Sequence, residues 1–423
     1  MIAARPMVKY KWFAALAALI LLGWFGLRST SGGGALPEIV QQRISGLPDT
    51  EEEWHGKVDY PKLANQLAAL SLRPEMAGLA VAVVEEGELR FVRSYGFADR
   101  SSGARVTPQT VFRWASVSKT VAGMLAASLA EDGLLNLDRT VASWPTSLRL
   151  PQGAEARITL GQLLAQQTGL TKNAYDERLE AGESPTAIRQ QLVAAPLQCE
   201  PGTCHTYQNV AFDTASEIMG QATKRPYEVA VRGRFFDPLG MASASYGMVG
   251  LTAANDWAKP HRGAEVRPLK ENYWRVPAAA GVNSNIVDFA RWMQATMGRR
   301  TDVLPSTVLK RAQSPRVLTA RLYSGDLARA LNGASYGLGW RSFTYNGRLL
   351  VGHSGAVDGY RATMIFEPAT QTGVVAMWNS NWGVPFRIPF AVFDSYHGNA
   401  DANWLRLDDM PAAAADRVLT TQD

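Results

Sequence analysis

The order of strand-like and helix-like segments constrains the fold of this 423-residue chain more than any other feature. Short apolar runs bounded by turn residues gather near its two ends and predict strands. The expected strands are 78–84, 89–94, 339–345, 349–351, 361–366 and 373–378. Between them, apolar residues recur at three- and four-residue steps and predict helices. The expected helices are 116–132, 160–167, 185–194, 209–223 and 286–297, with another at 384–396. This order predicts an α+β fold, in which the two ends share an antiparallel sheet flanked by helices and carrying an inserted, mostly helical lobe.

The length and the 46% hydrophobic content allow one large core. We expect a leader with a linker at 1–36, one main domain at 37–410 and a loose tail at 411–423. Within the main domain, the sheet is expected from about 76–100 and 335–398, and the helical lobe from about 116–330.

Residues 12–27 form an uncharged apolar run that follows Arg5, Lys9 and Lys11. Positive charge before such a run keeps the N-terminus in the cytoplasm and sends the rest of the chain outward. The run suits a signal peptide, and it is also apolar enough to remain as an anchor. We therefore expect a periplasmic or otherwise extracytoplasmic protein, which residues 12–27 hold to the inner membrane if they are not cleaved.

The net charge of +5 is modest, and part of it comes from the cationic residues of the leader. No basic stripe and no nucleic-acid-binding motif accompany it. Nucleic acid is therefore not an expected partner.

Ser116 and Lys119 lie at the start of the predicted helix 116–132. Residues three apart share a helix face, so the hydroxyl and the amine are expected within reach of each other. A serine becomes a nucleophile when a neighbour accepts its proton, and a lysine accepts a proton when its pKa is lowered. The positive end of the helix dipole favours a neutral amine. The alternative is an ordinary capped surface helix, because serine is a common N-cap residue.

Two triplets follow far along the chain, Tyr207-Gln208-Asn209 after a Pro-Gly turn and His353-Ser354-Gly355 at the end of a strand. In isolation, the tyrosine and the histidine are more often structural residues. The order Ser-x-x-Lys, Tyr-x-Asn, His-x-Gly resembles the penicillin-recognising serine hydrolases. The similar branch contains class C β-lactamases, D,D-carboxypeptidases and related esterases, and the resemblance runs from about Met76 to about Gly398.

This resemblance implies a β-lactamase/D,D-peptidase-like fold and a role for each motif residue. Ser116 would attack a carbonyl and become acylated, Lys119 would take or relay its proton, and Tyr207 would be the second proton-transfer group. The implied substrate-binding residues are Asn209, His353, Ser354 and Gly355. The backbone N–H groups of Ser116 and Ala356 would form the oxyanion hole.

The third motif departs from the Lys-Thr-Gly that is usual in class C β-lactamases. A lysine carries a fixed charge for a substrate carboxylate, whereas His353, with an ordinary pKa near 6.5, would be only partly charged at pH 7. The departure favours a D,D-peptidase, a low-turnover penicillin-binding protein or an esterase over an efficient β-lactamase.

Cys199 and Cys204 flank the turn that leads to Tyr207, and the chain contains no other cysteine. In an exported relative of this family, a disulfide between them would pin the turn. Two free thiols, or a metal site that includes His205, are the alternatives. We expect no metal and no other cofactor.

Two further alternatives concern the function. Residues 352–356 look like an imperfect nucleophile elbow of an α/β-hydrolase, which requires a strand, the serine and then a helix. A catalytically silent penicillin-binding relative would be expected to have lost a motif residue. We therefore expect an exported serine hydrolase that acts on small-molecule or peptide substrates with peptide, ester or β-lactam carbonyls; a carboxylesterase of the same fold is the alternative.

Overall fold

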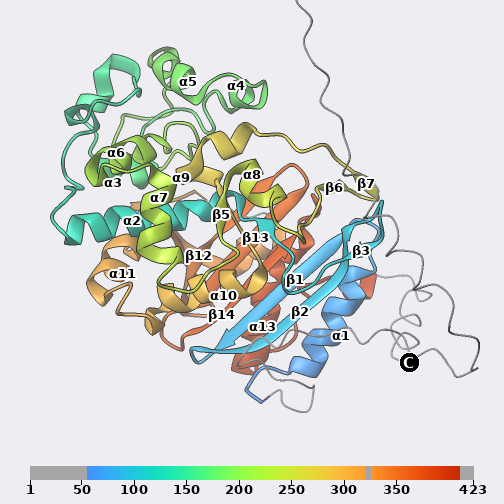
Figure 1. Ribbon diagram of the computed structural model, residues 1–423. Helices are drawn as coiled ribbons and strands as arrows, with labels where there is room; N and C mark the ends of the chain where they lie inside the picture. Colours follow the sequence, from blue (N-terminus) through green and yellow to red (C-terminus); the bar gives the residue numbers. More distant parts are fainter. Residues whose placement is uncertain (1–54, 321–324, 410–423) are drawn as a thin grey trace, which may run out of the picture. The chain divides into compact units, whose positions relative to one another are not determined.

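A computed structural model describes residues 55–320 and 325–409. Its main element is a nine-stranded antiparallel sheet of order β3-β2-β1-β14-β13-β12-β11-β10-β9 (Figure 1). Its strands are β1 (Gly78–Glu85), β2 (Glu88–Asp99), β3 (Ala104–Arg105), β9 (Val317–Leu318), β10 (Leu331–Tyr336), β11 (Arg341–Tyr345), β12 (Arg348–Val357), β13 (Tyr360–Glu367) and β14 (Thr372–Trp378).

The first and last parts of the sequence meet in the middle of this sheet. Strand β1 pairs with β14 in antiparallel register, with Leu79 opposite Trp378 and Val84 opposite Gly373. In Figure 1 the blue β1 and β2 lie beside the red strands of the C-terminal part. The predicted α+β fold is confirmed. The sequence does not predict β10 or the edge strand β9. Strand β12 is longer than predicted and includes residues 353–355.

Helices cover both faces of the sheet. Leu79, Val81 and Val83 share one cluster with side chains of α1 (Tyr60–Ser71) and α13 (Ile388–His397). Because successive side chains of a strand point to opposite faces, the residues between them face the other side, where α10 (Ile286–Gln294) packs on β1 and β14. All eight residues of β1 are buried, which explains why its sequence shows a continuous apolar run.

The helical lobe follows the first strands, and its helices are mostly shorter than the sequence predicts. They are α2 (Ser118–Glu131), α3 (Leu160–Leu164), α4 (Asp176–Glu180), α5 (Pro185–Gln191), α6 (Thr214–Thr223), α7 (Tyr227–Val231), α8 (Gly247–Thr252), α9 (Pro277–Ala280), α11 (Ser306–Gln313) and, among the late strands, α12 (Gly325–Ala330). The lobe also contains β4 (Phe112–Arg113), β5 (Ser245–Tyr246), β6 (His261–Arg262), β7 (Glu265–Val266) and β8 (Val282–Ser284).

A buried ion pair connects helix α5 with helix α6 of the lobe. Arg189 of α5 lies 3.1 Å from Asp213 and 2.8 Å from Glu217, and the exposed fractions of the Arg189 and Asp213 side chains are 5% and 2%. The other oxygen of Asp213 accepts the backbone N–H of Ala278 at 2.8 Å. The ion pair therefore also holds α9, which borders the site described below.

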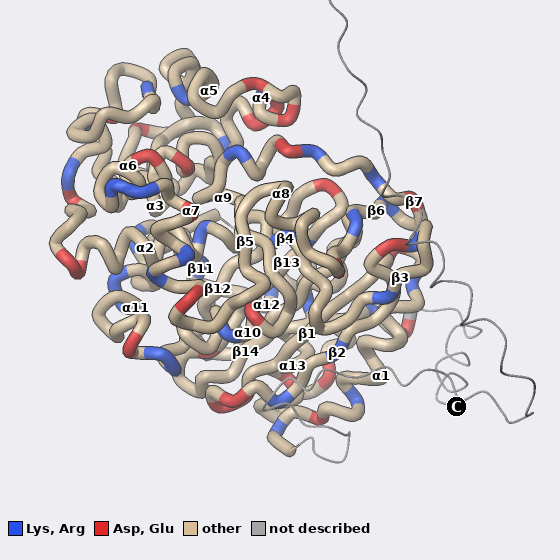
Figure 2. The backbone as a smooth tube through the Cα atoms, in the orientation of Figure 1, with Lys and Arg blue, Asp and Glu red and all other residues tan. Residues whose placement is uncertain are grey.

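Acidic and basic residues are interspersed over the described elements (Figure 2). Within residues 55–320 and 325–409, no helix is long and apolar enough to cross a membrane. The predicted leader at 1–36, with its apolar run 12–27, and the predicted tail at 411–423 lie outside the described residues.

Candidate active site

Ser116 lies in a 3₁₀ turn, Ala115–Val117, directly after β4 and before α2. The turn is fixed on both sides, since the Trp114 N–H donates to Val282 O at 2.9 Å and the Ser118 hydroxyl donates to Ala115 O at 2.7 Å. Ala115 has a φ of +48°, a strained conformation for a residue with a Cβ. Ser118 is fully buried, whereas Ser116 lines a cavity of about 470 Å³. Ser116 is therefore the accessible serine of the motif.

Strand β12 passes unusually close to this turn. A Cβ placed on Gly355 would lie 2.2 Å from Trp114 O and 2.9 Å from Ser116 N, so only glycine permits the approach. Ser354, Gly355 and Ala356 line the same cavity as Ser116. The structure thus brings together the two backbone segments from which the sequence predicts an oxyanion hole.

Lys119 lies in the first turn of α2 and is fully buried. Its ammonium donates to Asn209 Oδ1 at 2.7 Å and to Ala279 O at 3.1 Å. It also lies 4.8 Å from the centre of the Tyr207 ring. Tyr207 and Asn209 line the cavity with Ser116, so the first two motifs meet as predicted.

Asp176 is a member of the site for which the sequence offered no motif. Its Oδ2 accepts the Asn209 amide at 2.6 Å and the Tyr273 hydroxyl at 3.3 Å, while its buried Oδ1 has no partner among the described residues. Burial raises the pKa of Asp176, although the Asn209 hydrogen bond and the charge of Lys119 oppose this shift. Asp176 fixes the Asn209 amide, which leaves its oxygen directed at Lys119.

His353 is placed differently from our expectation. Its ring is 2% exposed and does not line the cavity. Nδ1 lies 2.7 Å from the Ser354 carbonyl oxygen, and Nε2 lies 3.0 Å from the Tyr336 hydroxyl. Because a carbonyl only accepts, Nδ1 carries the proton and Nε2 accepts from Tyr336.

Burial lowers the pKa of His353 well below 6.5, and Arg341 and Lys119 lower it further. The expected partial charge at this position is therefore wrong, and the assignment of the His353 side chain as a substrate contact is corrected. Arg341 of β11 and Lys172 are the Lys and Arg side chains that line the cavity, and Arg341 is the one beside Tyr207. Its guanidinium lies 5.4 Å from the ring centre of Tyr207 and 5.1 Å from that of Tyr336.

The segment that carries Tyr207 is held from two sides. Cys199 and Cys204 form a disulfide, so neither sulfur is free to bind a metal. The Gln166 side chain donates to Gln208 O at 3.0 Å and accepts the Gln208 N–H at 2.7 Å. This anchoring fixes the backbone on which Tyr207 and Asn209 stand.

The nucleophile-elbow alternative is excluded by the strands. Ser354 lies within β12, which pairs with β11 and β13, and β13 follows it directly. An elbow needs a helix after its serine. The Ser354 hydroxyl lies 3.0 Å from that of Thr363, beside the cavity that Ser116 lines.

Comparison with known proteins agrees with this geometry. The family model described as Beta-lactamase matches residues 63–389. The chain is 27% identical over 340 residues to the unguisins hydrolase ungD of Aspergillus violaceofuscus, covering 73% of this chain and 59% of that protein. It is 25% identical over 310 residues to the protein flp of Staphylococcus aureus, covering 72% and 60%. The match thus spans about three-fifths of these relatives.

Two solved structures share the fold. A penicillin-binding protein homologue from Pyrococcus abyssi, which is octameric, superposes with a TM-score of 0.72 at 20% identity, covering 82% of this chain and 80% of that chain. A class C β-lactamase mutant superposes with a TM-score of 0.65 at 19% identity, covering 81% and 99%. The fold is therefore that of the penicillin-binding proteins and class C β-lactamases.

Proposed function

Because the chain belongs to the β-lactamase family, we propose that it is an exported serine hydrolase that forms an acyl-enzyme on Ser116. One observation carries the proposal. The Lys119 ammonium is buried one helical turn from Ser116, bound to Asn209 and next to the Tyr207 ring. Three motifs from distant parts of the chain meet at one cavity, as nucleophilic catalysis requires.

In the proposed reaction, Ser116 Oγ attacks the substrate carbonyl while its proton passes to Lys119 in its neutral amine form or to Tyr207 in its phenolate form. The carbonyl oxygen becomes an oxyanion, which the N–H groups of Ser116 and Ala356 stabilise. The bond to the leaving group then breaks, and Tyr207 returns a proton to that group. Water attacks the acyl-enzyme by the same route, and the acid and free Ser116 are released.

The preferred substrates are D,D-peptide-like or β-lactam-like carbonyl compounds with a carboxylate on the leaving-group side. Arg341 supports this choice, because it is the guanidinium that lines the cavity beside Tyr207 and guanidinium groups bind carboxylates bidentately. The hydrolase name of one relative supports hydrolysis in general. A carboxylesterase of the same fold remains the second candidate, and a non-catalytic penicillin-binding relative the third.

We place this activity in the periplasm. The Cys199–Cys204 disulfide supports an oxidising compartment, and the apolar run 12–27 supports export with retention at the inner membrane if it is not cleaved.

The test is to react the purified protein with a fluorescent penicillin and to assay nitrocefin, a p-nitrophenyl ester and a D-Ala-D-Ala peptide in parallel. Ser116→Ala should abolish both covalent label and turnover, whereas Ser306→Ala, on an exposed turn of α11, should change neither. Lys119→Ala should slow acylation by about 10²- to 10⁴-fold, the usual contribution of a general base. Turnover that persists in Ser116→Ala would refute the proposal, and the relative rates identify the substrate class.

A further inference from the structure

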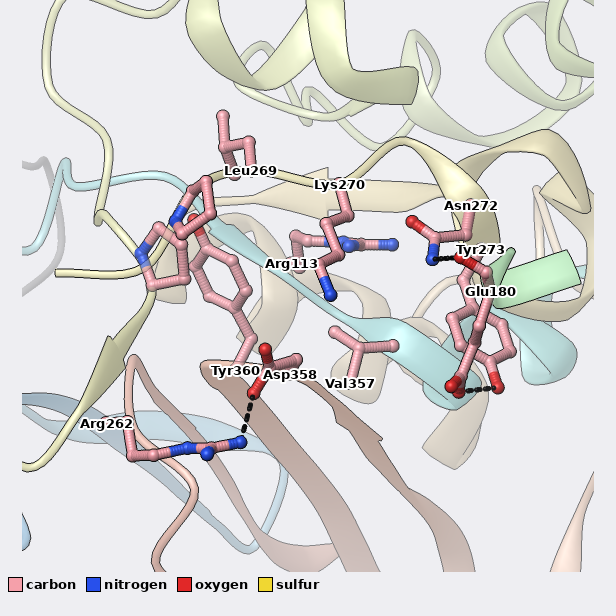
Figure 3. A pocket seen from close by; sticks show the side chains of 12 residues that line it. Arg113, Glu180, Arg262, Leu269, Lys270, Asn272, Tyr273, Val357, Asp358 and Tyr360 are labelled. Carbon is pink, nitrogen blue, oxygen red and sulfur yellow. Dashed lines mark hydrogen bonds and ion pairs between the residues drawn. The ribbon is translucent and has the colours of Figure 1, made fainter. Parts of the chain in front are cut away.

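A second cavity, of about 270 Å³, adjoins the one at Ser116. Tyr273 and Val357 line both of them. Figure 3 shows the second cavity with Arg113, Lys270 and Tyr360 among its lining side chains. The two cavities therefore share part of their walls.

Arg113 is the unusual residue of this cavity. It stands three residues before Ser116, on β4, and its side chain is 4% exposed. The guanidinium carbon lies 3.5 Å from the centre of the Trp274 ring. Nε and one terminal nitrogen are buried and lack a hydrogen-bond partner among the described residues. A buried guanidinium without an anion is costly, so Arg113 brings an uncompensated positive charge to the wall of this cavity.

The acidic residues of the cavity wall contact groups other than Arg113 and Lys270. Asp358 lies 3.7 Å from Arg262 and accepts the Asn381 amide at 2.9 Å. Glu180 accepts the Tyr273 hydroxyl at 2.9 Å. Lys270, at the rim, forms no ion pair with a residue of 55–320 or 325–409. Neither Arg113 nor Lys270 is thus neutralised by the carboxylates that share the cavity.

The position of the cavity indicates which part of a substrate enters it. Arg341 is opposite Gly352 in the sheet register, and Val357 lies five residues further along β12, about 17 Å away at the usual strand rise. In the proposed reaction the leaving group lies beside Tyr207, near Arg341. The acyl group therefore extends past Ala356 towards Val357 and the second cavity.

We propose that this cavity binds a carboxylate at the far end of the substrate's acyl group, with Arg113 as its main ligand and Lys270 as a weaker one. The inference rests on the proposed function, which defines the acyl side. It makes Arg113 a specificity residue for acyl groups that end in an anion, distinct from the contact of Arg341 with the leaving group.

The test compares p-nitrophenyl hydrogen adipate with its neutral isostere, p-nitrophenyl adipamate. The readout is the ratio of their kcat/KM values. Arg113→Met should lower this ratio about 10- to 100-fold, chiefly through KM, because hydrogen bonds to a charged group are lost. Arg113→Lys, which keeps the positive charge but lacks the paired N–H donors of a guanidinium, should give an intermediate ratio. Lys310→Ala, an exposed lysine on α11, is the control and should leave the ratio unchanged.

A binding measurement separates this inference from the proposed function. Adipate is titrated calorimetrically into Ser116→Ala and into Ser116→Ala with Arg113→Met. Should turnover persist in Ser116→Ala while adipate binding depends on Arg113, the proposed function fails and the anion site stands. If the esters are hydrolysed but Arg113→Met alters neither the ratio nor adipate binding, only this inference fails. A wild type that neither prefers the adipate ester nor binds adipate also overturns it.

Arg113→Met is expected to fold, since replacing an unpaired buried charge by an apolar side chain is commonly neutral or stabilising. If it does not, Lys270→Ala replaces it, because Lys270 is exposed and its loss leaves the core intact. A drop of about threefold in the same ratio is then expected, and an unchanged ratio refutes the inference.

Discussion

Gly355→Ala tests how strictly the close approach of β12 to the nucleophile is required. The new Cβ would lie 2.2 Å from Trp114 O, 2.9 Å from Ser116 N and 3.0 Å from the Ala115 Cβ, where ordinary contacts begin at 3.4 Å. Two of these atoms are backbone, so no flexible side chain can yield, and the strand must retreat by about 1 Å. A misplacement of about 1 Å at reacting groups costs about 10²-fold in rate.

We therefore expect kcat/KM for a p-nitrophenyl ester to fall about 100-fold and the free energy of unfolding to fall by about 1–3 kcal/mol, as for other overpacked sites. Gly233→Ala is the matched control, because nothing lies within 4 Å of its added Cβ, and it should alter neither quantity by much. Ester kinetics and urea unfolding of both variants measure the effects. Activity of Gly355→Ala within about threefold of wild type would refute the reasoning that glycine is needed for this approach.

Three further predictions concern buried groups. Arg189→Met leaves Asp213 without its main partner and should cost about 3–5 kcal/mol of stability in urea unfolding; a loss below about 1 kcal/mol would show that the ion pair does not hold the lobe. Cys204→Ser opens the small loop that the disulfide closes and should lower the free energy of unfolding by about 2 kcal/mol. The value of kcat should also fall, because the disulfide holds the segment that carries Tyr207; equal kcat in both proteins would contradict that role. Because the pKa of His353 is lowered by burial, the unfolded chain takes up a proton at a higher pH than the folded one. The His353 contribution to stability should therefore fall below about pH 6.5 by up to about 1.4 kcal/mol per pH unit. Burial also lowers the pKa values of His205 and His261, which add slopes of the same sign. His353→Asn should therefore reduce the slope without abolishing it; an identical slope in the variant would contradict the assignment.

The parts of the fold that the sequence predicts are those with a clear local pattern. The hairpin of β1 and β2 follows from two apolar runs separated by Glu86-Gly87, and β13 and β14 from similar runs. Strand β10 (331–336), which lies next to the short edge strand β9, is only half buried, with Asn332 and Gly333 exposed. Its sequence therefore lacks the apolar pattern from which a strand is inferred.

The site was predictable where short motifs carry it, at Ser116, Lys119, Tyr207 and Asn209, whose meeting the structure shows. The role of Asp176 depends on a hydrogen bond to Asn209, 33 residues away, and no local spacing encodes it.

At His353 the motif is present, but the charge predicted from it is wrong. The residue type suggested a titrating cation, but its charge depends on burial and on the neighbouring Tyr336 and Arg341. Such an environment is a property of tertiary packing. The sequence gives no signal for Arg341 for the same reason, because a lone arginine in a strand is usually a surface residue.

The pairing of β1 with β14 has a consequence for how this chain acquires its shape. Almost three hundred residues separate Leu79 from its partner Trp378, so all of the intervening chain must be synthesised before the hydrogen-bonded pairing of β1 with β14 can form. Contacts this distant in the sequence slow folding. A chain truncated before Thr372 leaves the apolar β1 without its neighbour, and we expect such a fragment to aggregate even though every catalytic motif is still present.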